Sequence, residues 1–241
     1  MSGSPGKNQG LSADRILATL QQLEARIMAR FPESGLSKVC AELISVGQWS
    51  AKDAANLAKP NYIWRVLITL VIALGILAQC AVLLRFLRVS GYDASGPEFL
   101  QALEAAVNLL ILFGGAAWSL ITLEERMKRR RALDALHSLR SLAHVVDMHQ
   151  LTKDPTVLLN PHQNTIASPQ RTMSRFELTR YLDYSAEMLA LIGKLAALYA
   201  DRMRDGVVIE AVNDLENLAA SLGRKIWQKI IILSALEEPR G

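Results

Sequence analysis

The sequence has only two cysteines, too few for a protein held together by disulfides. Cys40 lies in a stretch of mixed polarity and Cys80 inside a long hydrophobic run, so we do not expect them to pair. The beginning of the chain also lacks the apolar segment of a cleavable signal peptide. Residues 1–11 are instead rich in Gly and Ser, and we expect them to form a disordered tail.

The motifs of the common enzyme classes are missing as well. There is no Walker A loop, no G-x-G-x-x-G, no G-x-S-x-G, no C-x-x-C and no H-x-x-x-H, and no segment reads as a β-strand. The excess of basic over acidic residues gives a net charge of +4, too small to argue for a nucleic-acid partner. We therefore expect an all-α protein without a cofactor and without enzyme activity, although a catalytic pattern outside these motifs stays open.

Two long hydrophobic runs dominate what is present. Val66–Leu84 and Ala105–Leu123 each hold 19 residues without a charge. A hydrocarbon core of about 30 Å needs roughly 20 helical residues to cross it. The runs therefore predict two transmembrane helices, residues 62–87 and 101–123, joined by a short periplasmic loop, residues 88–100.

The distribution of basic residues predicts the orientation of these helices. Lys52, Lys59 and Arg65 precede the first run, whereas the connecting loop mixes Arg85 and Arg88 with acidic residues. Lys and Arg are retained on the cytoplasmic side, so both termini should be cytoplasmic. The loop is short enough for an antiparallel hairpin. The second run is followed by a basic cluster that we expect at anionic lipid head groups: Arg126, Lys128, Arg129, Arg130 and Arg131.

Polar and small residues interrupt both runs at similar depths. Amides in hydrocarbon need a partner, and small residues let helix backbones approach closely. We expect Gln79 and Asn108 at the contact of the two helices, although the same residues also suit a contact between subunits or the lining of a pore. The full polar seam comprises Gly75, Gln79, Asn108, Gly114, Gly115, Ser119 and Thr122, with Glu104 at its outer edge.

The rest of the chain predicts cytoplasmic helices. In residues 12–61, Ile16, Leu20, Leu23 and Ile27 form a narrow apolar stripe on a helix that begins after Ser12, and two shorter helices follow. In residues 124–241, the second membrane helix should continue to about Gln150. A Ser174–Glu177 capping box should start a long helix, and Asp205–Gly206 should end it before a last helix.

The histidines suggest one further kind of site. His137, His144, His149 and His162 lie close together in the sequence, and Asp147 follows His144 at helical spacing. His137, His144, Asp147 and His149 are thus candidate metal ligands, but the spacing matches no known metal motif. A structural role in a polar helix face and a role in pH sensing are alternatives.

Three segments resemble parts of uncharacterised two-pass bacterial membrane proteins. They are His137–Pro155, Arg180–Tyr184 and Lys225–Lys229. The resemblance implies a multi-pass protein of the bacterial inner membrane, and it carries no activity or binding residue. In layout alone the chain is similar to two-helix membrane effectors of bacterial conflict systems.

Three functional hypotheses follow. The first is a homo-oligomeric membrane protein without enzyme activity, whose helical cytoplasmic domain scaffolds or regulates an unknown protein partner. The second is an oligomeric ion channel or membrane-permeabilising effector built on the polar seam. The third is a metal-dependent membrane enzyme built on the histidines.

Overall fold

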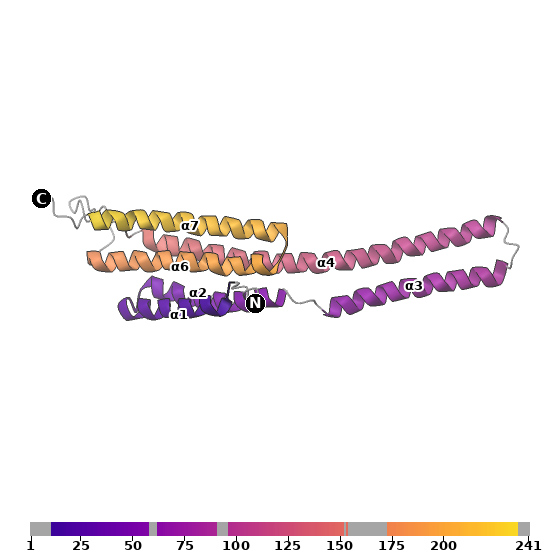
Figure 1. The fold of residues 1–241 in the computed structure, drawn as a ribbon, viewed down its shortest axis with the longest axis horizontal. Coiled ribbons are helices and arrows are strands. Elements are labelled where there is room, and N and C mark those ends of the chain that lie inside the picture. Colours follow the sequence, from indigo (N-terminus) through magenta and orange to yellow (C-terminus); the bar gives the residue numbers. More distant parts are fainter. Residues whose placement is uncertain (1–10, 58–61, 91–95, 152, 154–172, 236–241) are drawn as a thin grey trace, which may run out of the picture. The chain divides into compact units, whose positions relative to one another are not determined.

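The computed structural model describes residues 11–57, 62–90, 96–151, 153 and 173–235, and this described part contains helices and no strand. The all-α prediction is therefore confirmed. The helices are shown in Figure 1: α1 (Ala13–Arg30), α2 (Gly35–Leu57), α3 (Tyr62–Ser90), α4 (Gly96–Leu151), α6 (Arg175–Arg202) and α7 (Gly206–Ala235).

The chain divides into two compact units. Unit 1 consists of Met1–Ala58 and Arg131–Gly241, and unit 2 of Lys59–Arg130. Helix α4 contributes its first part to unit 2 and its second part to unit 1, as expected for a helix without Gly or Pro after Leu123. Unit 1 holds the large hydrophobic core, whereas unit 2 consists of α3 and the beginning of α4.

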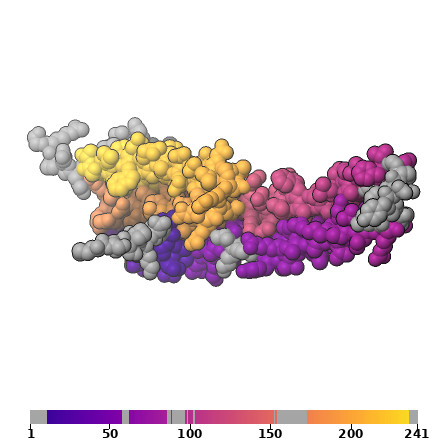
Figure 2. All heavy atoms as spheres, turned by 45° about the vertical axis from the view of Figure 1, so that its right-hand side comes forward, coloured from indigo at the N-terminus to yellow at the C-terminus, as the bar shows by residue number. Residues whose placement is uncertain are grey.

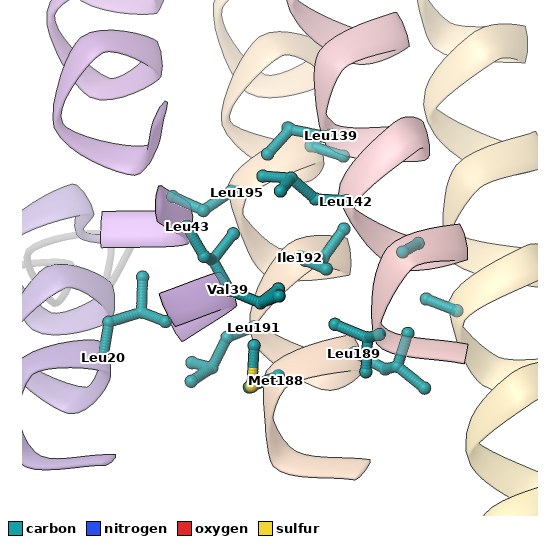
Figure 3. Packing of buried hydrophobic residues seen from close by; sticks show 14 of the residues in the cluster. Leu20, Val39, Leu43, Leu139, Leu142, Met188, Leu189, Leu191, Ile192 and Leu195 are labelled. Atoms are coloured by element: carbon teal, nitrogen blue, oxygen red, sulfur yellow. The ribbon is translucent and has the colours of Figure 1, made fainter. Parts of the chain in front are cut away.

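The core of unit 1 is built from α1, α2, α6, α7 and the second part of α4. The predicted stripe of α1, Ile16, Leu20, Leu23 and Ile27, is buried. Leu139 and Leu142 of α4 lie near Ile192 and Leu195 of α6 in Figure 3. Helix α6 is central, because it buries residues on several sides and packs against α1, α2 and α7.

Helix α2 differs from the prediction of two short helices. It runs without a break from Gly35 to Leu57, so Ser50 lies inside the helix and does not cap a new one. The Cβ of any larger residue at Gly47 would come within 3.2 Å of the side chains of Leu17 and Leu195. Gly47 thus allows other helices to pack closely against α2, and this packing outweighs the low helix propensity of glycine.

The α6–α7 turn agrees with the prediction except at Gly206. Ser174 and Glu177 form the expected capping box at the start of α6. Asp205 caps the next helix, because its carboxylate accepts hydrogen bonds from the N–H groups of Val207 (3.0 Å) and Val208 (3.2 Å). Gly206 is therefore the first residue of α7, and its predicted role as the residue that ends α6 is wrong.

Lys229 of α7 forms hydrogen bonds with the end of α4. Its Nζ donates to the side-chain oxygen of Gln150 at 2.6 Å and to the Gln150 carbonyl at 3.1 Å. The amide of Gln150 donates in turn to Asp147 at 2.6 Å. A cation at a helix C-terminus satisfies carbonyl groups that have no partner in the helix, so this network fixes where α4 ends against α7.

Burial in unit 1 predicts how stability responds to a core truncation. Leu139 is fully buried on α4, so Leu139→Ala should lower the free energy of unfolding by about 2–5 kcal/mol. The measurement is the denaturation of the detergent-solubilised protein, followed by circular dichroism. Met148→Ala is the matched control, because Met148 is on the same helix and 61% exposed. Equal effects of the two substitutions would contradict the assignment of this face of α4 to the core.

Candidate functional site

Helix α3 and the first part of α4 contact each other through residues of the predicted seam. A Cβ atom added at Gly75 would lie 2.9 Å from the Cβ of Phe113. Four residues further along α3, the amide of Gln79 donates to the carbonyl of Ala106 at 3.4 Å. Gly75 therefore permits the close approach of the two helices, and Gln79 finds its partner in the backbone of α4.

The polar residues of α4 lie on the other side of that helix. Phe113 marks the side of α4 that meets α3. At 100° per residue, Asn108 and Gly115 lie about 140° and 160° away from it, and Ser119 lies about 120° away. All three are exposed, and nothing lies within 4 Å of a Cβ added at Gly115. We call Asn108, Gly115 and Ser119 the outer stripe.

Gln79 therefore lies at the contact of the two helices, as expected, whereas Asn108 does not. The rotation of α4 about its axis turns the outer stripe away from α3. Gly114 also has nothing within 4 Å of an added Cβ. The hydroxyl of Thr122 donates to the carbonyl of Trp118 at 2.9 Å, so Thr122 is satisfied within its own helix.

The basic cluster after the second hydrophobic run keeps most of its charge at the surface. Lys128 forms an ion pair with Glu124 at 2.8 Å, four residues earlier on α4. Arg126, Arg130 and Arg131 are exposed. Arg131 also acts inside unit 1: burial raises the pKa of Asp53 on α2, and the positive charge of Arg131 offsets part of this rise.

The histidines do not converge on one point. His137 and His144 are exposed on α4, and Asp147 is bonded to Gln150. The ring of His149 lies against Gly35 at the start of α2, so close that a Cβ there would come within 2.3 Å of it. In the part of the chain that the structure describes, no three His, Cys, Asp or Glu residues form a group that could hold a metal ion. His162 lies outside the described residues.

A buried polar cluster in unit 1 was missed by the sequence analysis. Ser50 of α2 and Tyr199 of α6 are fully buried, and Asp53 lies one turn after Ser50. The hydroxyl of Tyr199 is close enough to interact with Ser50 and Asp53. However, Ser50 Oγ, Asp53 Oδ2 and Tyr199 Oη are buried without a hydrogen bond of good geometry within the described residues.

Burial dominates the titration of this cluster. Desolvation raises the pKa of Asp53, whereas the charge of Arg131 and the Tyr199 hydroxyl lower it. Burial likewise raises the pKa of Tyr199. For both groups, burial disfavours the charged form compared with the same group in water. The cluster is not visible in the sequence, because its members come from separate helices and Tyr199 reads as an ordinary apolar position of α6.

The position of the cluster in the chain is informative. Asp53 lies in the last two turns of α2, just before the chain enters unit 2, and Arg131 is the first residue of unit 1 after the chain returns. Tyr199 lies near the end of α6, the central helix of the core. Within unit 1, Asp53 therefore interacts electrostatically both with Arg131 of α4 and with Tyr199 of α6.

The thiol of Cys40 is in an environment that disfavours its reactive, deprotonated form. It is fully buried in the core, and burial raises the pKa of its thiol to about 12. A thiol with such a pKa remains protonated and is a poor nucleophile or metal ligand.

Comparison of the chain with protein-family models, with curated proteins and with solved structures finds no match.

The raised pKa of Asp53 predicts a pH dependence of stability. A folded-state pKa above the unfolded value of about 3.8 means that Asp53 adds stability below the unfolded pKa and loses this contribution as pH rises through the folded pKa. Asp53→Asn, which stays neutral, should therefore be at least as stable as the wild type at pH 7. The difference in melting temperature between variant and wild type should shrink as the pH falls toward 4.

The control for this experiment is Asp201→Asn, which removes an exposed carboxylate from the end of α6. It corrects for the change in net charge. If Asp53→Asn instead lowers the melting temperature at pH 7 and the loss disappears at low pH, then ionised Asp53 stabilises unit 1 and the assigned direction is wrong.

Proposed function

We propose that the protein is an integral membrane protein of the bacterial inner membrane, in which α3 and the first part of α4 form a transmembrane hairpin. The described helices include two that are long and apolar enough to cross a membrane. Neither apolar window is buried inside the protein, unlike the core helix of a soluble domain. Large side chains such as Val66 (67% exposed), Leu77 (70%) and Leu110 (71%) need a nonaqueous cover, and lipid supplies it.

The proposed topology keeps both termini and unit 1 in the cytoplasm. Its support is the basic cluster after the second span and the basic residues before the first. Tyr62, which is 74% exposed at the start of α3, suits the head-group level of the inner leaflet. The exposed arginines at the end of the second span suit anionic head groups at the same level.

We further propose that the protein is a homo-oligomer whose subunits contact each other through the outer stripe. The observation that carries this proposal is the exposure of Asn108 on the side of α4 that faces away from α3. An amide in hydrocarbon is stabilised by an interhelical hydrogen bond, and Gly115 on the same face allows a neighbouring helix to approach. A second copy of the hairpin provides both, because it brings another Asn108.

The cytoplasmic unit then serves as a scaffold or regulator of a protein partner, without enzyme activity. Its support is a large helical core that presents exposed apolar side chains on several helices, such as Trp49 (51% exposed) and Trp227 (54%).

An oligomeric channel is the second candidate, and the same exposed Asn108 favours it. Asn108, Gly115 and Ser119 would then line a water-filled path between several hairpins, because two helices alone cannot enclose one. The stripe carries no ionisable group at mid-membrane, which argues for a packing role and against selective ion conduction.

The topology is tested by cysteine labelling in a Cys80→Ser background. Ser95→Cys and Ser168→Cys are introduced separately; both positions lie outside the described residues. An impermeant maleimide added from the periplasmic side should label residue 95 and leave residue 168 unlabelled, because only the loop between the spans is outside. The reverse pattern would invert the orientation and place unit 1 in the periplasm.

Substitution of Asn108 by Leu tests the role of the outer stripe. Interhelical hydrogen bonds in membranes average about 0.6 kcal/mol, so Asn108→Leu should weaken self-association about threefold. Gly115→Leu should weaken it more, because added bulk separates the helices. The measurement is energy transfer between labelled subunits in vesicles. The control is Ile121→Ala, at an exposed apolar position of α4 that lies at least about 120° from every residue of the outer stripe.

Ion flux in the same vesicles separates the two candidates. A packing role predicts no flux for the wild type. Robust flux that Asn108→Leu removes, with self-association unchanged, would replace the scaffold by the channel.

A further inference from the structure

An open groove lies between α6 and α7 on unit 1. Its volume is about 410 Å³, and its floor and walls are made largely of small or buried residues such as Ala190, Gly193 and Ala220. Helix α7 is at the surface of unit 1 in Figure 2. The low walls would let a helix from another chain come close to the backbones of α6 and α7.

A large aromatic side chain stands at one end of this groove. The indole of Trp227 lines the groove and is 54% exposed, and Ile231, one turn further along α7, is 62% exposed. Ala220, Trp227 and Ile231 lie within about 40° of each other on α7 at 100° per residue. The face therefore combines a shallow hollow with an apolar projection, both without a cover in the described part of the chain.

Trp227 lies near the end of α7 that is bonded to the end of α4. Lys229 binds the end of α4 at Gln150, so this end of α7 lies level with the end of α4. Arg131, where the chain enters unit 1, is about 29 Å away along α4 at 1.5 Å per residue. Within unit 1, Trp227 thus lies far along α4 from Arg131.

The charges beside the groove are arranged symmetrically about Ala220. Glu216 lies four residues before Ala220 and Arg224 four residues after it, and both line the groove and are exposed. Within the described residues neither of them forms an ion pair. If another copy of α7 crosses antiparallel at Ala220, each Glu216 comes to the level of the partner's Arg224, so that two ion pairs form at once.

We infer that the α6–α7 groove is a two-fold self-association surface, in which the α7 helices of two protomers cross antiparallel at Ala220. In a two-fold interface the same patch must complement itself. Here the indole of Trp227 of each protomer covers the end of the partner's groove that contains Gly193. Glu216 of each protomer faces Arg224 of the other. The inference rests on the proposed homo-oligomer and assigns a contact to its cytoplasmic unit.

Disulfide trapping in native membranes tests this surface in the full-length protein. Ala220→Cys in a Cys80→Ser background should give a covalent dimer on mild oxidation, because the two copies of residue 220 meet at the symmetry axis. Lys225→Cys is the matched control: it is exposed on the same helix but about 140° from Ala220, and it should give none. Cys40 is buried and does not compete.

A charge reversal gives the decisive readout. Glu216→Arg alone and Arg224→Glu alone place like charges opposite each other and should each reduce the Ala220→Cys dimer about tenfold. The double variant Glu216→Arg/Arg224→Glu restores opposite charges and should recover the dimer. A double variant as defective as either single one, or a covalent product with a different protein, would overturn the inference.

A parallel trap in the membrane segment keeps this outcome separate from the proposed function. Ser119→Cys reports on contacts through the outer stripe. Dimers through residue 119 without dimers through residue 220 overturn the groove contact and leave the homo-oligomer standing. Dimers through neither residue overturn both, whereas dimers through residue 220 alone support the groove and remove the outer stripe as the subunit contact.

Discussion

The need to cover apolar surface governs both units of this protein. In unit 1 the chain covers its own apolar side chains, with α6 surrounded by α1, α2, α7 and the second part of α4. In unit 2 it does not, because two helices that touch along one side leave most of their surface outside. The first unit therefore has its own hydrophobic core, whereas the exposed apolar surface of the second is what the proposed lipid environment and the proposed subunit contact would cover.

Helix α4 is one continuous helix that belongs to both units. Its first part is apolar on nearly every side, whereas its second part buries one face, with Ala132, Leu139 and Val146 in the core. The change occurs at the basic cluster, where exposed arginines follow the apolar run. Within unit 1, Ser50, Asp53 and Tyr199 form a buried polar cluster, and burial raises the pKa of Asp53 and of Tyr199.

The polar side chains fall into two groups, those bonded inside their own unit and those exposed without such a bond. Gln79 and Gln150 are satisfied inside their units, by a carbonyl of α4 and by Lys229, and this gives them a role in packing. Asn108, Glu216 and Arg224 are exposed and lack such partners within the described residues. These residues carry the two proposed subunit contacts, because a second copy satisfies each of them.

The sequence by itself determined which segments are helical and which are apolar all round. Long uncharged runs, the stripe of α1 and the Ser174–Glu177 capping box depend on local spacing, so their positions were predictable. Local spacing also put Gln79 and Asn108 at the same depth. Only the tertiary structure decided how each helix is rotated about its axis, which turned Gln79 inward and Asn108 outward. It likewise brought Ser50, Asp53 and Tyr199 together from separate helices and joined α2 into one element across Gly47, because contacts between distant residues outweigh local propensity.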